Sequence, residues 1–218
     1  MIPIRDHNPS GRRPFVTYGL LATNIVVFVY MMTLGAAGLE GFINSQALIP
    51  ADIVRGLNLQ TLITSMFLHG SMGHIVGNMI FLHIFGDNLE DRFGHLRFML
   101  FYLLAGLAGS ALQIVIDPSS TIPNLGASGA IAGVMGGYLV LYPRHRIDVL
   151  WGFYGVSSVP ASFMLGYWIL FQFFGGFGSL GLAGGGVAYF AHIGGFALGY
   201  LLTRLAVSRQ QPTVKQIR

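Results

Sequence analysis

The stretch TIPNLGASGAIAGVMGGYLVLYP, residues 121–143, places a short apolar run directly after a loop-like segment. The apolar run begins at Ser128 and ends before Pro143, and its ~15 residues would form a helix of about 22 Å. The hydrocarbon core of a bilayer is about 30 Å thick. We therefore predict a helix over 128–142 that starts inside a membrane, where non-helical backbone is tolerated only beside protein or a water-filled cavity. The loop before Ser128 is the first indication of a functional site.

The composition of the chain independently indicates a membrane protein. The 218 residues are 53% hydrophobic and 9% charged, and the mean hydropathy is +0.64. Soluble domains carry roughly 25% charged residues, so a soluble enzyme and a disordered chain are excluded. Nucleic-acid binding is excluded as well, because only 12 basic residues stand against 8 acidic ones. The absence of cysteine removes disulfides, thiolate metal sites and a cysteine nucleophile.

Six apolar runs are candidates for membrane-spanning helices, since a span needs about 20 mostly apolar residues. They lie near 15–36, 73–90, 97–116, 128–142, 158–176 and 186–206. The predicted fold is all-α, a polytopic six-transmembrane-helix bundle over 15–206. Its flanks, 1–14 and 207–218, are predicted to be short cytoplasmic tails.

The basic residues orient this bundle. All of them except Arg55 fall in the two tails, in the segments after the second and fourth runs, or at the adjoining ends of the runs. With six spans these segments share one side, which the positive-inside rule makes cytoplasmic. Segments 37–72, 117–127 and 177–185 are then on the outer side. The short tails, with no targeting segment, favour a prokaryotic plasma membrane.

Polar side chains recur in the second, fourth and sixth runs, which all lead from the outer to the inner side. His74 and Asn78 open the second run and share a helix face, Ser128 opens the fourth, and His192 lies about two turns into the sixth. Ionisable residues inside spans are usually functional. We therefore expect these four side chains to meet in the outer half of the bilayer. His83 lies on the opposite helix face, which favours a packing or interfacial role, whereas His69 either holds the loop by hydrogen bonding or takes part in catalysis.

Small residues predict how the fourth and sixth helices pack. Gly129-x-x-x-Gly133 and Gly195-x-x-x-Gly199 are spacings that let helix backbones approach closely in membranes. Such an approach would bring Ser128 within hydrogen-bond reach of His192.

The residue types present in the spans limit which catalytic groups the protein can use. A neutral histidine is the usual base for a serine nucleophile, and no carboxylate lies in the middle of a span, so a Ser128–His192 dyad is the available arrangement. A Ser–Lys dyad is excluded because the only lysine, Lys215, is in the tail, an aspartyl dyad because no carboxylate lies in the middle of a span, and a metalloprotease because no HExxH sequence is present. No metal or other cofactor is expected. The Ser128 N–H, His74 and Asn78 would stabilise an oxyanion. Gly126 and Gly129 would leave room for a substrate carbonyl.

Three motifs carry a resemblance to a known family. Gly126-Ala127-Ser128-Gly129, the segment from His69 to Asn78, and Ala191-His192-x-x-Gly195-x-x-x-Gly199 resemble the patterns of rhomboid intramembrane serine proteases, in the same order along the chain. The resemblance extends over about 15–206. It implies Ser128 as nucleophile, His192 as general base, and His74 and Asn78 as oxyanion stabilisers.

The implied reaction is hydrolysis of a peptide bond in or near a transmembrane segment of another protein, so the expected partners are transmembrane substrates and the lipid bilayer. One departure concerns the first outer segment, where Gln60-Thr61 replaces the Trp-Arg of many members. The oligomeric state is not predicted. The glycine-rich stretch 175–186 is either a lid over the site or only a flexible loop.

Two other functions are weighed against proteolysis. A non-catalytic relative would bind transmembrane segments without cutting them, but Ser128 and His192 are both present. A transporter or channel would use the polar layer as a pathway, but the polar groups are confined to the outer half and include no carboxylate.

Overall fold

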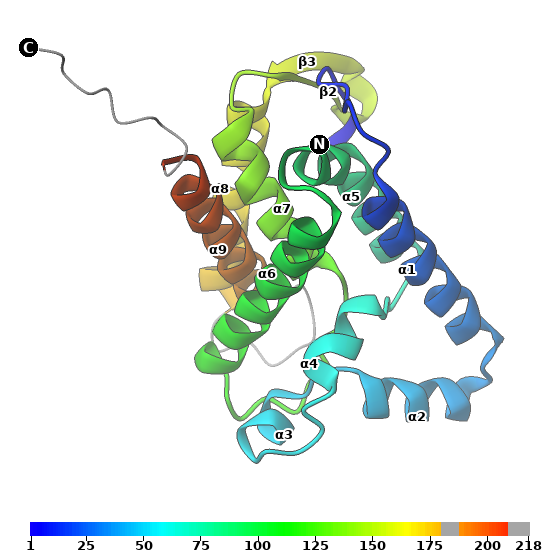
Figure 1. Ribbon diagram of the computed structural model, residues 1–218. Helices are drawn as coiled ribbons and strands as arrows, with labels where there is room; N and C mark the ends of the chain where they lie inside the picture. Colours follow the sequence, from blue (N-terminus) through cyan, green and yellow to red (C-terminus); the bar gives the residue numbers. More distant parts are fainter. Residues whose placement is uncertain (180–187, 209–218) are drawn as a thin grey trace, which may run out of the picture.

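The computed structural model describes residues 1–179 and 188–208 (Figure 1). Most of these residues are helical, and long helices form a bundle. The bundle helices are α1 (Phe15–Thr33), α5 (Met72–Phe93), α6 (His95–Ile116), α7 (Ser128–Leu141), α8 (Ala161–Ser179) and α9 (Tyr189–Ser208). They correspond to the six predicted runs, with ends shifted by a few residues.

Not all of these helices have the composition of a membrane span. Within the described ranges, four are long and apolar enough to cross a bilayer, namely α1, α6, α8 and α9. Helix α7 is apolar but has only 14 residues, as its predicted start inside the membrane requires. Helix α5 has 22 residues but ends in the charged sequence Glu90-Asp91-Arg92. The protein therefore has membrane-spanning helices, while the count of six and the orientation stay predictions.

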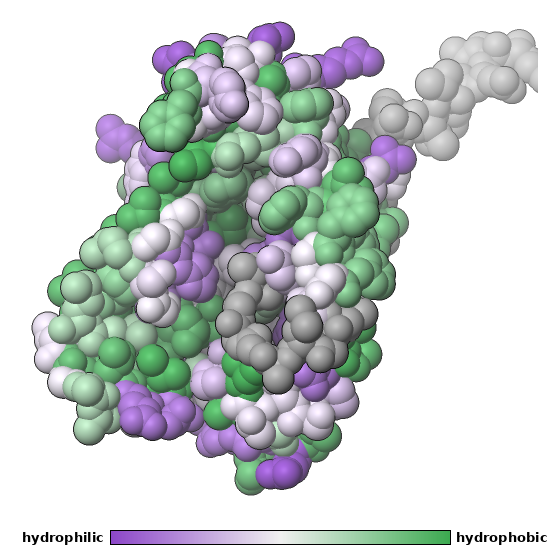
Figure 2. Space-filling model, turned by 180° about the vertical axis from the view of Figure 1, so that it is seen from behind, coloured by the Kyte–Doolittle hydropathy of each residue, from purple (hydrophilic) through white to green (hydrophobic). Residues whose placement is uncertain are grey.

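The surface of the bundle is apolar over a broad band. Figure 2 shows one face on which hydrophilic residues gather toward the upper and lower ends, with a further hydrophilic group in a hollow near the middle. Large apolar side chains on the outer helices are exposed, including Val26 on α1 and Phe174 on α8, at 66% and 70%. Lipid tails solvate such side chains without cost.

A small β-sheet corrects the all-α prediction. Strands β1 (Ile2–Asp6), β2 (Arg146–Leu150) and β3 (Val156–Pro160) pair antiparallel in that order. Each strand has five residues, and in β2 only alternate side chains are buried, so the strands give no apolar run. The N-terminal tail and the start of the fifth predicted run are therefore partly strand.

The sheet binds the N-terminus to one end of the bundle. Arg5 donates to Asp148 at 2.8 Å, and His7 pairs with the same carboxylate at 2.9 Å. Hydrogen bonds from His7 and Arg5 lower the pKa of Asp148 to about 2. Asp6 accepts a hydrogen bond from the hydroxyl of Tyr138 on α7 at 2.9 Å. The segment predicted as a tail is thus docked on the bundle, whereas residues 209–218 of the C-terminal tail lie outside the described ranges.

The segment predicted as an outer loop, 37–72, is largely helical and lies at the opposite end of the molecule from the sheet (Figure 1). Its elements are α2 (Ala36–Gln46), α3 (Pro50–Val54), α4 (Thr61–Thr64) and the 3₁₀ turn η1 (Ser65–Phe67). Leu48 and Asn124 exchange backbone hydrogen bonds of 3.0 and 2.7 Å, and the Gly126 N–H donates to the Ser65 carbonyl at 2.9 Å. These bonds fix the loop that leads into α7.

Helix α7 is the centre of the bundle. It contacts α5, α6, α8 and α9, and every residue from Gly129 to Tyr138 is buried. The contact with α9 is made by backbone, because a Cβ atom on Gly195 would clash with the Gly129 carbonyl, and one on Gly199 with the Gly133 carbonyl. The predicted close approach of these two helices is confirmed.

We predict that Gly199→Val lowers the free energy of unfolding by about 1–3 kcal/mol, because overpacking forces the two backbones apart. The matched control is Gly166→Val on α8, where an added Cβ meets nothing within 4 Å. Denaturation of both variants in detergent, followed by circular dichroism, measures the difference. Equal stability of the two variants would contradict the direct backbone contact.

Candidate active site

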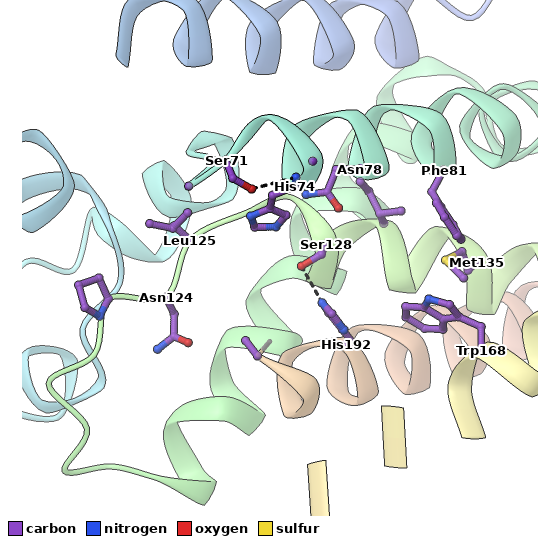
Figure 3. A pocket seen from close by; sticks show the side chains of 16 residues that line it. Ser71, His74, Asn78, Phe81, Asn124, Leu125, Ser128, Met135, Trp168 and His192 are labelled. Atoms are coloured by element: carbon purple, nitrogen blue, oxygen red, sulfur yellow. Dashed lines mark hydrogen bonds between the residues drawn. The ribbon is translucent and has the colours of Figure 1, made fainter. Parts of the chain in front are cut away.

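Ser128 and His192, which the sequence places 64 residues apart, are hydrogen-bonded. The distance from Ser128 Oγ to His192 Nε2 is 2.8 Å (Figure 3). Ser128 is the first residue of α7, and His192 lies in the first turn of α9 with only 8% of its surface exposed. The backbone contact between these helices brings the two side chains together, as the glycine spacing predicts.

The pair opens into a cavity of about 570 Å³, whose lining includes His74 and Asn78 from α5. Ser71 caps this helix by accepting a hydrogen bond from the His74 N–H at 3.2 Å, and Figure 3 shows His74 and Asn78 on the same side of the cavity as each other, facing Ser128. All four predicted side chains therefore lie around one space.

His69 holds Asn78 in place. The Asn78 side-chain nitrogen lies 2.8 Å from His69 Nε2, and His69 is only 1% exposed. Of the two roles left open for His69, this contact supports the one based on hydrogen bonding. His83 lies elsewhere, exposed and stacked on Tyr18 with ring centroids 6.5 Å apart, which agrees with a packing role.

The two glycines beside Ser128 have different surroundings. Gly126 has a φ of +129°, which favours glycine, and a Cβ there would lie 2.8 Å from the His74 ring. Gly129 is buried, and its carbonyl faces Gly195 of α9. Neither residue lines the 570 Å³ cavity. Their proposed contact with substrate stays a prediction, but Gly126 sets how closely His74 approaches the start of α7.

Helix α8 contributes two residues that the sequence analysis missed. The Gln172 side-chain oxygen lies 2.7 Å from His192 Nδ1, and the Trp168 ring packs beside the His192 ring, tilted by 36° with centroids 5.6 Å apart. A signal was present in the sequence, because an amide in the middle of an apolar run requires a partner and Trp168 is four residues away on the same face.

The Gln60-Thr61 pair, which departs from the family pattern, lies at the start of α4. Thr61 is buried, at 1% exposure, while Gln60 is exposed. The stretch proposed as a lid, 175–186, belongs to α8 as far as Ser179, and its remainder lies outside the described ranges.

The arrangement can activate a hydroxyl group. A serine whose Oγ–H points at a neutral imidazole nitrogen can lose its proton to that nitrogen as the oxygen attacks. The Ser128 N–H is in the first helical turn, where no intrahelical acceptor is available, and His74 and Asn78 bring further polar groups to the same space. Such donors stabilise a developing oxyanion.

Comparison with known proteins identifies the family. The sequence model of the Rhomboid domain matches residues 57–209. The chain belongs to the rhomboid family. Rhomboid proteins similar to this one include RHOMBOID-like protein 4 of Arabidopsis thaliana, which is 35% identical over 150 residues, or 69% of this chain and 34% of that protein.

Two further relatives come from other organisms. Mitochondrial Rhomboid protein 1 of Saccharomyces cerevisiae is 29% identical over 192 residues, covering 85% of this chain and 51% of the relative. Rhomboid protease GluP of Bacillus subtilis is 33% identical over 135 residues, covering 62% of this chain and 26% of the relative. The chain thus spans about half or less of the length of these curated rhomboid relatives.

We predict that Gly126→Ala slows the reaction of Ser128 with a fluorophosphonate probe, because the new methyl group displaces His74. Loss of one oxyanion donor costs up to about 10²–10³ in rate, so we expect labelling to be about 10- to 100-fold slower. The control is Gly152→Ala, which also has a positive φ, +65°, but meets nothing within 4 Å. Wild-type labelling of Gly126→Ala would show that His74 does not influence Ser128.

Proposed function

We propose that this rhomboid protein is an intramembrane serine endopeptidase that hydrolyses peptide bonds in or near transmembrane segments. The observation that carries the proposal is the 2.8 Å hydrogen bond between Ser128 Oγ and His192 Nε2 inside a cavity of about 570 Å³. Family membership adds support, since one relative, GluP, is named a protease.

In this proposal the bundle helices α1, α5, α6, α7, α8 and α9 all cross the bilayer. Both termini face the cytoplasm, and Ser128 lies toward the outer side. The short length of α7 is compatible with this placement, because the helix is buried among other helices and a helix surrounded by protein need not match the thickness of the hydrocarbon. We place the protein in a prokaryotic plasma membrane, although some relatives are named mitochondrial.

The reaction would proceed through an acyl-enzyme. His192 Nε2 takes the Ser128 proton while Oγ attacks the scissile carbonyl carbon, giving a tetrahedral intermediate. The Ser128 N–H and the side chains of His74 and Asn78 stabilise its oxyanion. His192 then gives the proton to the leaving amine, and a water molecule activated by His192 hydrolyses the ester.

The substrate is expected to be locally unwound at the cleavage point. In a transmembrane helix each carbonyl accepts a hydrogen bond within the segment, so it is shielded from attack. A stretch with small or helix-breaking residues near the outer membrane face reaches an extended form at lower cost. The partners implied are therefore single-span or multi-span membrane proteins and the bilayer itself.

We predict that Ser128→Ala and His192→Ala each reduce cleavage of a single-span reporter substrate by at least about 10³-fold. His83→Ala supplies the matched control, because His83 lies on α5 but stacks on Tyr18. Purified protein in detergent, with fragments detected by mass spectrometry, gives the readout.

The same experiment tests the non-catalytic alternative. If Ser128→Ala cuts as well as wild type, the assignment of Ser128 as nucleophile is wrong. If wild type neither cuts nor reacts with a fluorophosphonate, yet retains the reporter on an affinity resin, the protein binds transmembrane segments without cleaving them.

A further inference from the structure

His192 is held on both sides by α8, a helix that carries none of the predicted site residues. Gln172 is 5% exposed and contacts His192 Nδ1 at 2.7 Å through its side-chain oxygen. Trp168, one turn earlier, packs beside the imidazole, tilted by 36° at a centroid separation of 5.6 Å, and also stacks on Phe196 of α9 at 6.3 Å. The imidazole therefore has a defined partner for its second nitrogen and a defined aromatic neighbour.

The amide of Gln172 has only one favourable orientation. Its nitrogen lies 3.2 Å from the Trp168 carbonyl oxygen, and a carbonyl can accept but never donate a hydrogen bond. The NH₂ group must therefore face Trp168, and the amide oxygen must face His192. A flipped amide would place two acceptors against each other on the Trp168 side.

The orientation of the amide determines where the imidazole carries its proton. The Gln172 oxygen can only accept, so His192 Nδ1 must be the donor. In a neutral imidazole the other nitrogen then has a lone pair, and that nitrogen, Nε2, is the one 2.8 Å from Ser128 Oγ. The hydrogen bonds thus run in one direction, from Ser128 Oγ–H to His192 Nε2 and from His192 Nδ1–H to Gln172.

We infer that Gln172 is a positioning residue that fixes His192 in the tautomer able to accept the Ser128 proton. The inference rests on the proposed protease function. In soluble serine hydrolases a carboxylate commonly orients the base. An amide performs the same orientation without placing a charge inside an apolar bundle, where a charged group is costly.

The experiment compares Gln172→Met with Gln172→Glu. Methionine keeps the length of the side chain but removes the acceptor, so we expect kcat to fall about 10- to 100-fold with KM changed less than about twofold. Glutamate, whether protonated or ionised, still presents an oxygen to Nδ1, so we expect kcat within about tenfold of wild type. Leu170→Met, on the lipid-exposed face of α8 at 53% exposure, controls for a methionine in this helix.

A spectroscopic readout separates this inference from the proposed function. In protein labelled with ¹⁵N-histidine, with the His192 signals assigned by their loss in His192→Ala, we expect a proton on Nδ1 in wild type and a mixture of tautomers in Gln172→Met. A proton on wild-type Nε2, or wild-type kcat in Gln172→Met, would overturn the inference. If no variant cleaves substrate, the proposed function fails, and the wild-type spectrum still decides the tautomer.

Discussion

The backbone contact between α7 and α9 is the constraint on which the site depends. Glycines let the two helices touch without intervening side chains, since a Cβ on Gly195 or Gly199 would clash with a carbonyl of α7. Helix α6 also contacts the backbone of α9 directly, because a Cβ on Gly109 would clash with the Ala191 carbonyl. Ser128 precedes the first contact residue of α7, and His192 precedes Gly195 by one turn. Once the backbones meet, the Ser128–His192 hydrogen bond follows from the helix geometry, and no loop has to bring the two residues together.

Two carboxylates outside the site, Glu90 and Asp6, form hydrogen bonds with the ends of neighbouring helices. Glu90 of α5 is 1% exposed and accepts hydrogen bonds of 2.7 and 2.8 Å from the Thr17 and Val16 N–H groups. Helix α1 has no capping side chain of its own at Pro14, so a carboxylate from another helix satisfies its free donors and complements its dipole. Asp6 of β1 instead accepts a hydrogen bond from the Tyr138 hydroxyl near the C-terminal end of α7. These charged groups lie at the end of the bundle that carries the sheet, away from Ser128.

The sequence was most informative where a long-range contact followed from a local pattern. The glycine spacing in 128–142 and 186–206 predicted the close helix pair, and helix periodicity placed His74 and Asn78 on one face. It was least informative where short elements depend on partners distant in sequence. The strand Ile2–Asp6 pairs with Arg146–Leu150, but its own sequence, Ile-Pro-Ile-Arg-Asp, shows no alternation of polar and apolar residues that would mark it as a strand. The same holds for Gln172, whose role is visible only when α8 is placed against His192.

The site differs from the rest of the polar structure in that its groups can all be neutral. A serine, histidines, an asparagine and a glutamine each need only hydrogen-bond partners to be buried, whereas a carboxylate also needs compensation for its charge. The structure supplies such partners: His69 for Asn78, Gln172 for His192, and the Trp168 carbonyl for Gln172. Charge arises there only transiently in the proposed reaction, on the oxyanion and on the imidazole, and the two charges form close to one another. Their mutual attraction at low dielectric offsets part of the cost of creating them, which is how a site without a permanent charge can serve acyl transfer inside a membrane protein.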